Sequence, residues 1–293
     1  LTSQGVAVTL TETANSDGSY TYEATAGTEA VFTLTINTDG SYNFTLQGPI
    51  DHAQNGEDQL TLNFPIIATD FDGDTSTETI PVTITDDIPT ITAVESITVD
   101  EDDLANMGSD GSNSVSIDGH FTTTEGSDRV VSYQLDTNAS PVANLTSQGV
   151  AVNLIETANT DGSFTYTATA DNGTTVEPVF TLIVNTDGTY NFTLEGPIDH
   201  AQNGEDQLTL NFPIIATDSD GDTSTETIPV TITDDIPTIT AVEAITVDED
   251  DLANMGSDGS NSVSIDGHFT TTQGSDRVVS YQLDTNATPV ANL

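Results

Sequence analysis

Hydrophobic and polar residues alternate along most of the chain, with the two-residue period of β-strands that bury one face. Clear examples lie at residues 6–10, 20–22, 32–36, 42–46, 60–66 and 80–84. The period of an amphipathic helix, between three and four residues, does not stand out anywhere. The pattern therefore predicts an all-β protein with no significant helix.

Turn signals separate these runs and indicate how the strands are connected. Asp-Gly pairs, which are typical of tight hairpins because they tolerate positive φ angles, occur at 17–18, 39–40, 161–162 and 187–188. About nine short strands in each repeat, with a turn every 8–12 residues, indicate tandem Ig-like β-sandwich domains. Pro81 and Pro229 interrupt strand-like runs, which predicts an edge strand or a bulge at each.

The sequence repeats itself with a period of about 148 residues, which indicates a tandem array. The segment LTSQGVAV at residues 1–8 recurs at 145–152, and the segment at 48–68 returns almost unchanged at 196–216. A unit found in near-identical copies suits a structural array better than a catalytic domain.

The motif Asp-Asp-Ile-Pro gives the best signal for where one repeat ends. It follows a strand-like run at Asp86 and again at Asp234, and its proline blocks further ladder pairing. We therefore expect residues 1–87 to be the C-terminal part of one repeat, 88–235 to be a complete repeat, and 236–293 to be the N-terminal part of the next.

The charge of the chain changes this picture, because 48 acidic residues face only two basic ones and the formal net charge is −46. Such repulsion opposes compaction, so either the chain is disordered or bound cations neutralise part of the charge. Ten Phe, seven Tyr and many β-branched residues argue against disorder. Divalent cations held by carboxylates are the better account, and Ca²⁺ is the expected cofactor.

The composition also excludes several classes of site and partner. There is no Cys, Lys or Trp, which excludes disulfides, thiolate metal sites and Schiff bases. With only two basic residues, we expect no nucleic-acid partner, since phosphates would be repelled. No run of 18 apolar residues occurs, so we expect no membrane insertion.

Three kinds of acidic cluster recur and are the predicted calcium ligands. The first kind is the loop Asp-x-Asp-Gly-Asp, the second is the Asp-Asp pair, and the third is a run of four acidic residues. Their alternating or adjacent carboxylates can converge on one hard cation, which takes six to eight oxygens. The predicted ligands are Asp70, Asp72, Asp74, Asp86, Asp87, Asp100, Glu101, Asp102, Asp103, Asp218, Asp220, Asp222, Asp234, Asp235, Asp248, Glu249, Asp250 and Asp251. For the isolated aspartates of the Asp-Gly turns, a solvated structural role is the simpler interpretation.

Strand direction predicts how these clusters meet. In the complete repeat the loop after Asp218 lies at the end where the chain enters, and Asp234 lies at the end where it leaves. In a head-to-tail array, Asp86 and Asp87 of one repeat should therefore meet the loop of the next, within about 15 Å, and share a calcium ion with its three aspartates. The first strand, Thr90 to Val99, should carry the four-acid run to the end near Asp234.

Together these motifs resemble a known family. Asp51-His52, the run from Ala68 to Asp74 and the run from Thr83 to Pro89 are similar to the tandem repeats of giant type I-secreted RTX adhesins of Gram-negative bacteria. The resemblance covers the whole chain. It implies Ig-like extender domains, export without Sec processing, an extracellular location at the cell surface, and calcium taken from the medium.

The function expected from these observations is that of a calcium-stiffened spacer in a bacterial surface adhesin, which projects adhesive domains and supports cell adhesion or biofilm formation. The partners would be neighbouring repeats of the same chain. One alternative is a filament or matrix protein that self-associates. Another is a carbohydrate- or protein-binding module, which exposed Tyr20, Tyr22 or Tyr133 would favour.

An enzyme is the remaining alternative, and we expect none. The four histidines are His52, His120, His200 and His268. Asp51 and His52 could suggest an acid–base pair, but neighbours in an extended chain point to opposite sides. A capping or packing role for His52 in a loop is the better interpretation, and no nucleophile elbow, phosphate loop or zinc spacing is present.

Overall fold

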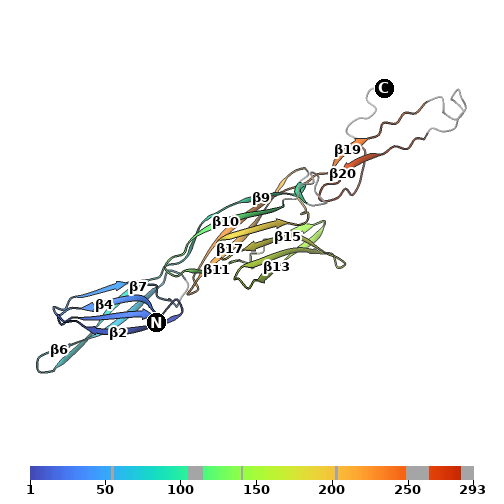
Figure 1. Ribbon diagram of the computed structural model, residues 1–293. Coiled ribbons are helices and arrows are strands. Elements are labelled where there is room, and N and C mark those ends of the chain that lie inside the picture. The colour runs from blue at the N-terminus through green and yellow to red at the C-terminus, as the bar shows by residue number, and fades with distance from the viewer. Residues whose placement is uncertain (54–55, 105–114, 140, 202–203, 249–263, 285–293) are drawn as a thin grey trace.

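The computed structural model describes residues 1–53, 56–104, 115–139, 141–201, 204–248 and 264–284, and nearly all of its regular structure is β-strand. Within these residues the one helical element is a single 3-10 turn, η1 (Glu101–Asp103). The all-β prediction is therefore confirmed. The strands form three units that follow one another in a row (Figure 1): a first unit (β1–β7), a second unit (β8–β18) and a third unit (β19–β20).

The first unit contains one five-stranded antiparallel sheet and one separate hairpin. The sheet has the order β1 (Thr2–Ser3), β2 (Val6–Ala14), β3 (Tyr20–Ala26), β4 (Glu29–Ile36) and β5 (Tyr42–Leu46). The hairpin pairs β6 (Gln59–Thr69) with β7 (Thr75–Thr85). Phe32, Phe44 and Phe64 pack between sheet and hairpin, with ring centroids 5.1–6.0 Å apart.

The second unit is a complete sandwich of two sheets. The order in the larger sheet is β12-β13-β14-β15-β16-β10-β8, and in the smaller sheet it is β11-β17-β18-β9. The strands of this unit are β8 (Thr90–Val94), β9 (Ile97–Asp100), β10 (Ser116–Thr124), β11 (Val130–Leu135), β12 (Thr146–Ser147), β13 (Val150–Ala158), β14 (Phe164–Asp171), β15 (Val176–Val184), β16 (Thr189–Leu194), β17 (Gln207–Asp218) and β18 (Thr223–Thr233). The count slightly exceeds the nine predicted per repeat because it includes the two-residue β12 and a divided first strand.

The core of the second unit follows directly from the alternation in its strands. Phe180, Phe192 and Phe212 are fully buried and meet with centroids 5.2–6.1 Å apart, in the same arrangement as their counterparts in the first unit. Alternate residues of β17 and β18, such as Ile214 and Val230, are also fully buried. Burying each large apolar side chain contributes about 1.5–3 kcal/mol, and so this face stabilises the sandwich.

The strand predicted from Thr90 to Val99 is divided, which corrects the sequence-based expectation. β8 pairs with β10 in the larger sheet, whereas β9 pairs in parallel with β18 in the smaller sheet. The chain crosses from one sheet to the other at Glu95, whose carbonyl oxygen accepts a hydrogen bond from the Tyr190 hydroxyl. No glycine or proline marks this crossing in the sequence, which is why alternation alone misses it.

The prediction of an edge or a bulge at Pro229 is only partly right. The register between β17 and β18 runs through Asn211 and Pro229 without a shift, so there is no bulge. On the other side of β18, the ladder with β9 begins at Val230, immediately after the proline. Pro229 therefore lies where that side of the strand has no ladder partner to lose. Pro81 lies in β7, which pairs with β6 and with no other strand that the structure describes.

The Asp-Gly pairs form hairpin turns, as predicted, and their aspartates close the turns. Gly18 and Gly162 have φ angles of 88° and 89°, which favour glycine. In both turns the aspartate Oδ1 accepts hydrogen bonds from the backbone N–H and the hydroxyl of the serine two residues later. These contacts lower the pKa of Asp17 and Asp161.

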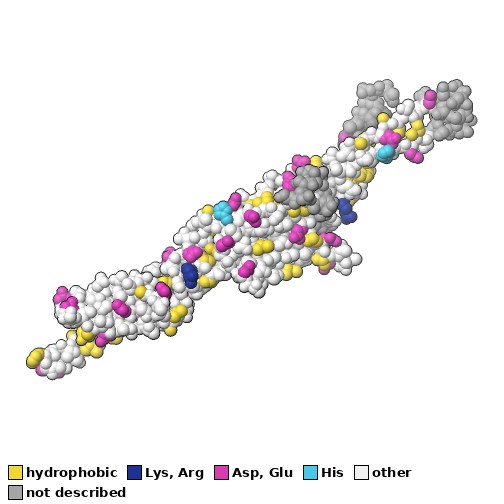
Figure 2. All heavy atoms as spheres, in the orientation of Figure 1, with side chains coloured by type: hydrophobic (Ala, Val, Ile, Leu, Met, Phe, Trp, Pro, Cys, Tyr) yellow, Lys and Arg dark blue, Asp and Glu magenta, His cyan; other side chains and the backbone are white. Residues whose placement is uncertain are grey.

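The third unit consists of the hairpin-like pair β19 (Thr238–Val242) and β20 (Phe269–Thr272). The unit boundaries expected from the sequence fall between β7 and β8 and between β18 and β19. Figure 2 shows acidic side chains along the whole length of the molecule, as the net charge of −46 requires. No helix among the described residues is long and apolar enough to cross a membrane.

Candidate metal centres between the units

The Asp-x-Asp-Gly-Asp loop is a tight turn that its first aspartate closes. In the second unit Asp218 Oδ1 accepts hydrogen bonds from the backbone N–H groups of Gly221 and Asp222, at 3.1 and 2.7 Å. Gly221 has a φ angle of 108°, a conformation that side-chain-bearing residues rarely adopt. With Asp218 closing the turn, the carboxylates of Asp220 and Asp222 are left to point out of the loop.

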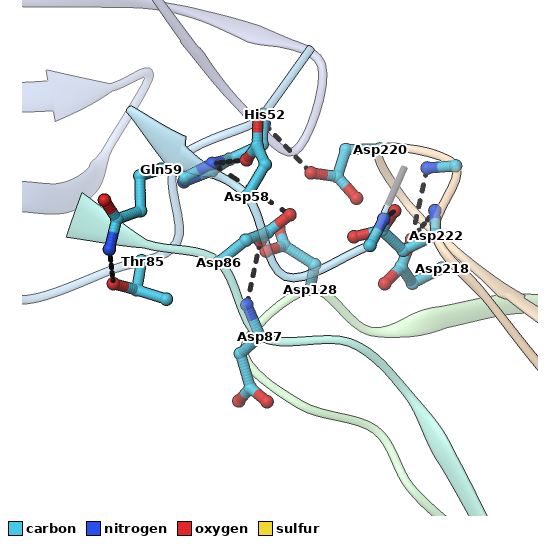
Figure 3. A network of polar contacts seen from close by, with 12 residues as sticks. His52, Asp58, Gln59, Thr85, Asp86, Asp87, Asp128, Asp218, Asp220 and Asp222 are labelled. Carbon is cyan, nitrogen blue, oxygen red and sulfur yellow. Dashed lines mark hydrogen bonds and ion pairs between the residues drawn. The ribbon is translucent and has the colours of Figure 1, made fainter. Parts of the chain in front are cut away.

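The first unit meets this loop directly, and we call the region of contact the first seam. The backbone N–H of His52 donates to Asp220 Oδ2 at 2.9 Å, and that of Gly56 donates to Asp222 Oδ1 at 2.6 Å. Asp86 follows β7 and contributes a third carboxylate. Ligand oxygens of Asp86, Asp220 and Asp222 all lie within 4.8 Å of one another (Figure 3). The structure thus brings Asp86 to the loop, well inside the predicted 15 Å.

The carboxylates of the first seam are buried and incompletely hydrogen-bonded. Among the described residues, Asp86 Oδ2, Asp218 Oδ2 and Asp222 Oδ2 have no hydrogen-bond partner and almost no contact with solvent. Burial, together with the neighbouring carboxyl groups of the loop, raises the pKa of Asp86 and of Asp218 to about 6. Buried, mutually repelling oxygens of this kind fit a hard divalent cation, because a cation supplies the missing partner to all of them.

Asp128 belongs to the same seam, although the sequence argument did not include it among the ligands. It is almost fully buried, and burial raises its pKa to about 6, with added repulsion from Asp220, Asp218 and Asp51. The signal that could have identified it is repetition, because Gly-Ser-Asp-Arg occurs at 126–129 and again at 274–277.

His52 and Asp58 were also missed as members of this network. The buried His52 ring contacts Asp58 through Nδ1, and the same nitrogen lies 4.0 Å from Asp86 Oδ2. Asp51 instead accepts a hydrogen bond from the backbone N–H of Gly5, so it does not pair with His52. The expected packing role of His52 in a loop agrees with its burial, and the ion pair adds to that role.

Other predicted ligands lie outside the group. Asp87 donates its backbone N–H to Asp86, while its own carboxylate points away from the loop (Figure 3). The Asp87 carboxyl group packs against Gly126, where a Cβ atom would come within 3.3 Å of Asp87 Cγ. Asp70, Asp72 and Asp74 do approach one another within 4.8 Å, but all three are exposed at the far end of the first unit.

The second seam joins the second unit to the third and has a different composition. β9 runs parallel to β18 with Asp100 opposite Thr233, so η1 lies beside Asp234, as the strand direction predicted. Glu101 is fully buried there. Its Oε1 accepts from the backbone N–H of Ile198 at 2.7 Å, and its Oε2 accepts from the Ser275 hydroxyl at 2.5 Å.

Electrostatics at the second seam are dominated by desolvation. Burial raises the pKa of Glu101 to about 8, against the opposing effect of its hydrogen bonds from Ser275 and Ile198. Burial, together with repulsion from Asp199 and Asp234, likewise raises the pKa of Asp276 to about 6. Ligand atoms of Glu101, His200 and Asp234 lie within 4.8 Å of one another.

Among the described residues, the two groups do not include the remaining predicted ligands. The Asp100 carboxylate caps η1 by accepting from the backbone N–H of Asp102, and Asp103 ends the turn. Asp235 is buried after Asp234, and Asp248 is exposed. Glu249, Asp250 and Asp251 lie outside the described residues.

Comparison with known proteins places a family in the middle of the chain. Residues 96–231 match the family described as Domain of unknown function (DUF5801). The match covers most of the second unit and includes Glu101, His200 and the Asp218–Asp222 loop, and it is consistent with a repeat domain. No curated protein matches the chain.

Proposed function

We propose that this chain is a calcium-stiffened spacer: a set of tandem β-sandwich repeats in a secreted bacterial surface adhesin, where Ca²⁺ bound at the first seam fixes the angle between the neighbouring units. The observation that carries the proposal is the first seam. There Asp86 of one unit meets Asp220 and Asp222 of the next, with their ligand atoms within 4.8 Å and several oxygens buried without partners.

The chemistry of the seam favours calcium over other neutralising partners. The ligand atoms of Asp86, Asp220 and Asp222 are all carboxylate oxygens, the donors that Ca²⁺ takes at about 2.3–2.6 Å. No Lys occurs in the chain, and the two Arg residues cannot neutralise 48 carboxylates. A bound cation would replace repulsion between the two units by attraction, so the units would hold one orientation.

A spacer needs this property more than it needs a ligand pocket. With the seams fixed, three units in a row form a rod (Figure 1), whereas repelling seams would let the units swing. Folding would be completed where calcium is available, because metal binding and folding are linked. For the binding-module alternative, Tyr133 packs in the core against Phe121, whereas Tyr20 is exposed and Tyr22 is half-buried on β3.

The proposal is tested by small-angle scattering and calorimetry of the 293-residue chain, first with calcium and then after its removal. When calcium is removed, we expect the distribution of interatomic distances from scattering to broaden, because the units change their relative orientation. We also expect the melting temperature to fall. The variant Asp220→Asn should show both changes even in calcium, and Asp72→Asn, the matched position in the exposed loop of the first unit, should not. Identical scattering and melting with and without calcium would refute the proposal.

A further inference from the structure

The second seam contains a histidine whose contacts differ from those of any other histidine in the described residues. Its side chain is 2% exposed. The Nε2 atom of His200 has no hydrogen-bond partner there and points at Glu101, with 3.8 Å between Nε2 and Oε1. An imidazole nitrogen buried between carboxylates needs a proton or a metal ion to make that contact favourable.

We propose that Glu101, His200 and Asp234 bind a divalent transition metal of the zinc class, at a site separate from the oxygen-only calcium group of the first seam. The three ligand atoms already lie within 4.8 Å of one another. Two donors bound to one tetrahedral zinc ion at about 2.0–2.2 Å are about 3.4 Å apart, so the 3.8 Å between His200 and Glu101 needs only a small closure.

The donor set decides the class of metal. Calcium takes oxygen ligands almost without exception, whereas imidazole nitrogen suits zinc and its transition-metal neighbours. One nitrogen and two carboxylates are a common zinc donor set and leave a fourth position for water. The sequence argument assigned Glu101 and Asp234 to calcium, and the position of His200 beside them is the reason for a different assignment.

The surroundings of the site hold its ligands in place. His200 Nδ1, the ring nitrogen on the other side, lies 3.1 Å from Asp206 Oδ1 without hydrogen-bond geometry, so the carboxylate that could orient the ring as in metal-binding histidines is close by but not yet bonded to it. Glu101 is fixed through both of its oxygens, by the backbone N–H of Ile198 and by the Ser275 hydroxyl. Because Ser275 lies beyond β20 in the third unit, metal binding by Glu101 would couple the second unit to the third.

The first seam provides an internal comparison. His52 occupies the position of His200 in the preceding repeat. Its Nδ1 contacts Asp58 and faces Asp86. The group around it consists of His52, Asp58 and Asp86, and the repeat position that corresponds to Glu101 would lie before Leu1. Both seams thus place a carboxylate beside Nδ1 of the histidine, and within this chain the second seam adds Glu101 on the Nε2 side, so we expect the zinc-class site there.

The test is isothermal titration of the full chain with Zn²⁺ in saturating Ca²⁺, so that oxygen-only sites are already filled. We expect about one Zn²⁺ per chain, with affinity at least tenfold weaker in His200→Gln. The control is His268→Gln, an exposed histidine that pairs only with Glu243 at 2.6 Å, and it should bind as the unchanged protein does. Circular dichroism of each variant checks that the sandwich is intact.

A second measurement needs no substitution at the site. In protein labelled with ¹⁵N at histidine, Zn²⁺ should shift the Nε2 resonance of one buried histidine while the exposed pair stays unchanged. The proposal is overturned if no buried histidine responds, if His200→Gln binds Zn²⁺ as well as the unchanged chain, or if Ca²⁺ alone displaces the Zn²⁺. The calcium proposal is judged separately, because Asp220→Asn acts only at the first seam.

Discussion

The two Asp-x-Asp-Gly-Asp loops have nearly the same sequence and the same internal hydrogen bonds, yet one is a buried group and the other is open to solvent. In each loop the first aspartate, Asp70 or Asp218, accepts from the same two backbone N–H groups. Asp222 is 2% exposed, whereas its counterpart Asp74 is exposed. The difference is the neighbouring unit, which covers only the second loop.

The cores show the same contrast. Tyr190 is 1% exposed and Tyr42, its counterpart in the first unit, is 54% exposed. In the described part of the chain, β10 pairs with the strand of Tyr190, whereas no strand pairs with β5 on the corresponding side of Tyr42. The comparison teaches that the sequence of a repeat determines its local turns and strand faces, while contact with other strands and units decides which of those features become buried. Four predictions test this comparison, three of them with pairs of equivalent residues and one through the pH dependence of the first seam.

The largest effect should come from the aromatic core. Phe212→Ala should lower the free energy of unfolding of the second unit by about 3–5 kcal/mol, because it opens a cavity in a closed sandwich. Phe64→Ala should cost less than about 3 kcal/mol, because the smaller core of the first unit leaves that ring partly exposed already. Hydrogen exchange read out by mass spectrometry separates the two units. Equal costs would mean that the first unit is as well packed in solution as the second.

The seam carboxylates should give an effect of the opposite sign with and without calcium. Asp222→Asn removes a charge beside Asp86, so in calcium-free buffer it should raise the melting temperature, by an amount equivalent to about 1–3 kcal/mol. In calcium it removes a ligand and should lower the melting temperature. Asp74→Asn is the matched control and should change neither. A variant Asp222→Asn that destabilises equally in both buffers would argue that the carboxylate is structural.

The pH dependence of the seam is the third prediction. Burial raises the pKa of Asp86, Asp128 and Asp218 from 3.8 to about 6, so the folded seam keeps protons that the unfolded chain releases. In calcium-free buffer this contribution to stability is complete below about pH 4 and is lost as the pH rises through about 6.

Calcium should reverse this trend, because the ion binds ionised carboxylates. Melting temperatures between pH 4 and pH 7.5 should therefore fall with pH in the calcium-free protein and rise with pH in calcium. The turn aspartates, such as Asp17, have lowered pKa values, so they lose their contribution to the free energy of unfolding only as the pH falls through the acid range. They therefore do not hide the trend expected between pH 4 and pH 7.5. Parallel curves in the two buffers would contradict a calcium-dependent seam.

Much of the fold could be predicted because it depends on local patterns. Alternation identifies the buried faces that carry Phe180 and Phe212, and strand direction alone places Asp86 near Asp220 and the four-acid run near Asp234. The crossing at Glu95 could not be predicted, because it depends on a hydrogen bond from Tyr190, which is 95 residues away. Longer-range packing can override a local pattern in this way.

The candidate sites were predicted less completely, for the same physical reason. The prediction relied on carboxylates that are adjacent in sequence. Of the Asp86-Asp87 pair, however, Asp87 turns toward Gly126. The residues that were missed, Asp128, His52 and Asp58, enter the seam from other loops. Neighbouring residues of an extended chain point in opposite directions, so one member of each adjacent pair tends to leave the group. A seam built from several loops becomes visible only when the units are placed end to end.

The smallest effect should come from the hairpin turns, where the two units have no reason to differ. Asp17→Ala and Asp161→Ala each remove the same two hydrogen bonds from the carboxylate to the following serine, in turns that are open to solvent in both units. We expect each variant to lower the melting temperature of its own unit by the same small amount, about 4 °C or less. Hydrogen exchange of the backbone amides of Ser19 and Ser163 measures the local effect. A clear difference between the two turns would show that neighbouring units influence even these solvent-exposed hairpins. The dependence on neighbours would then not be limited to the buried seams.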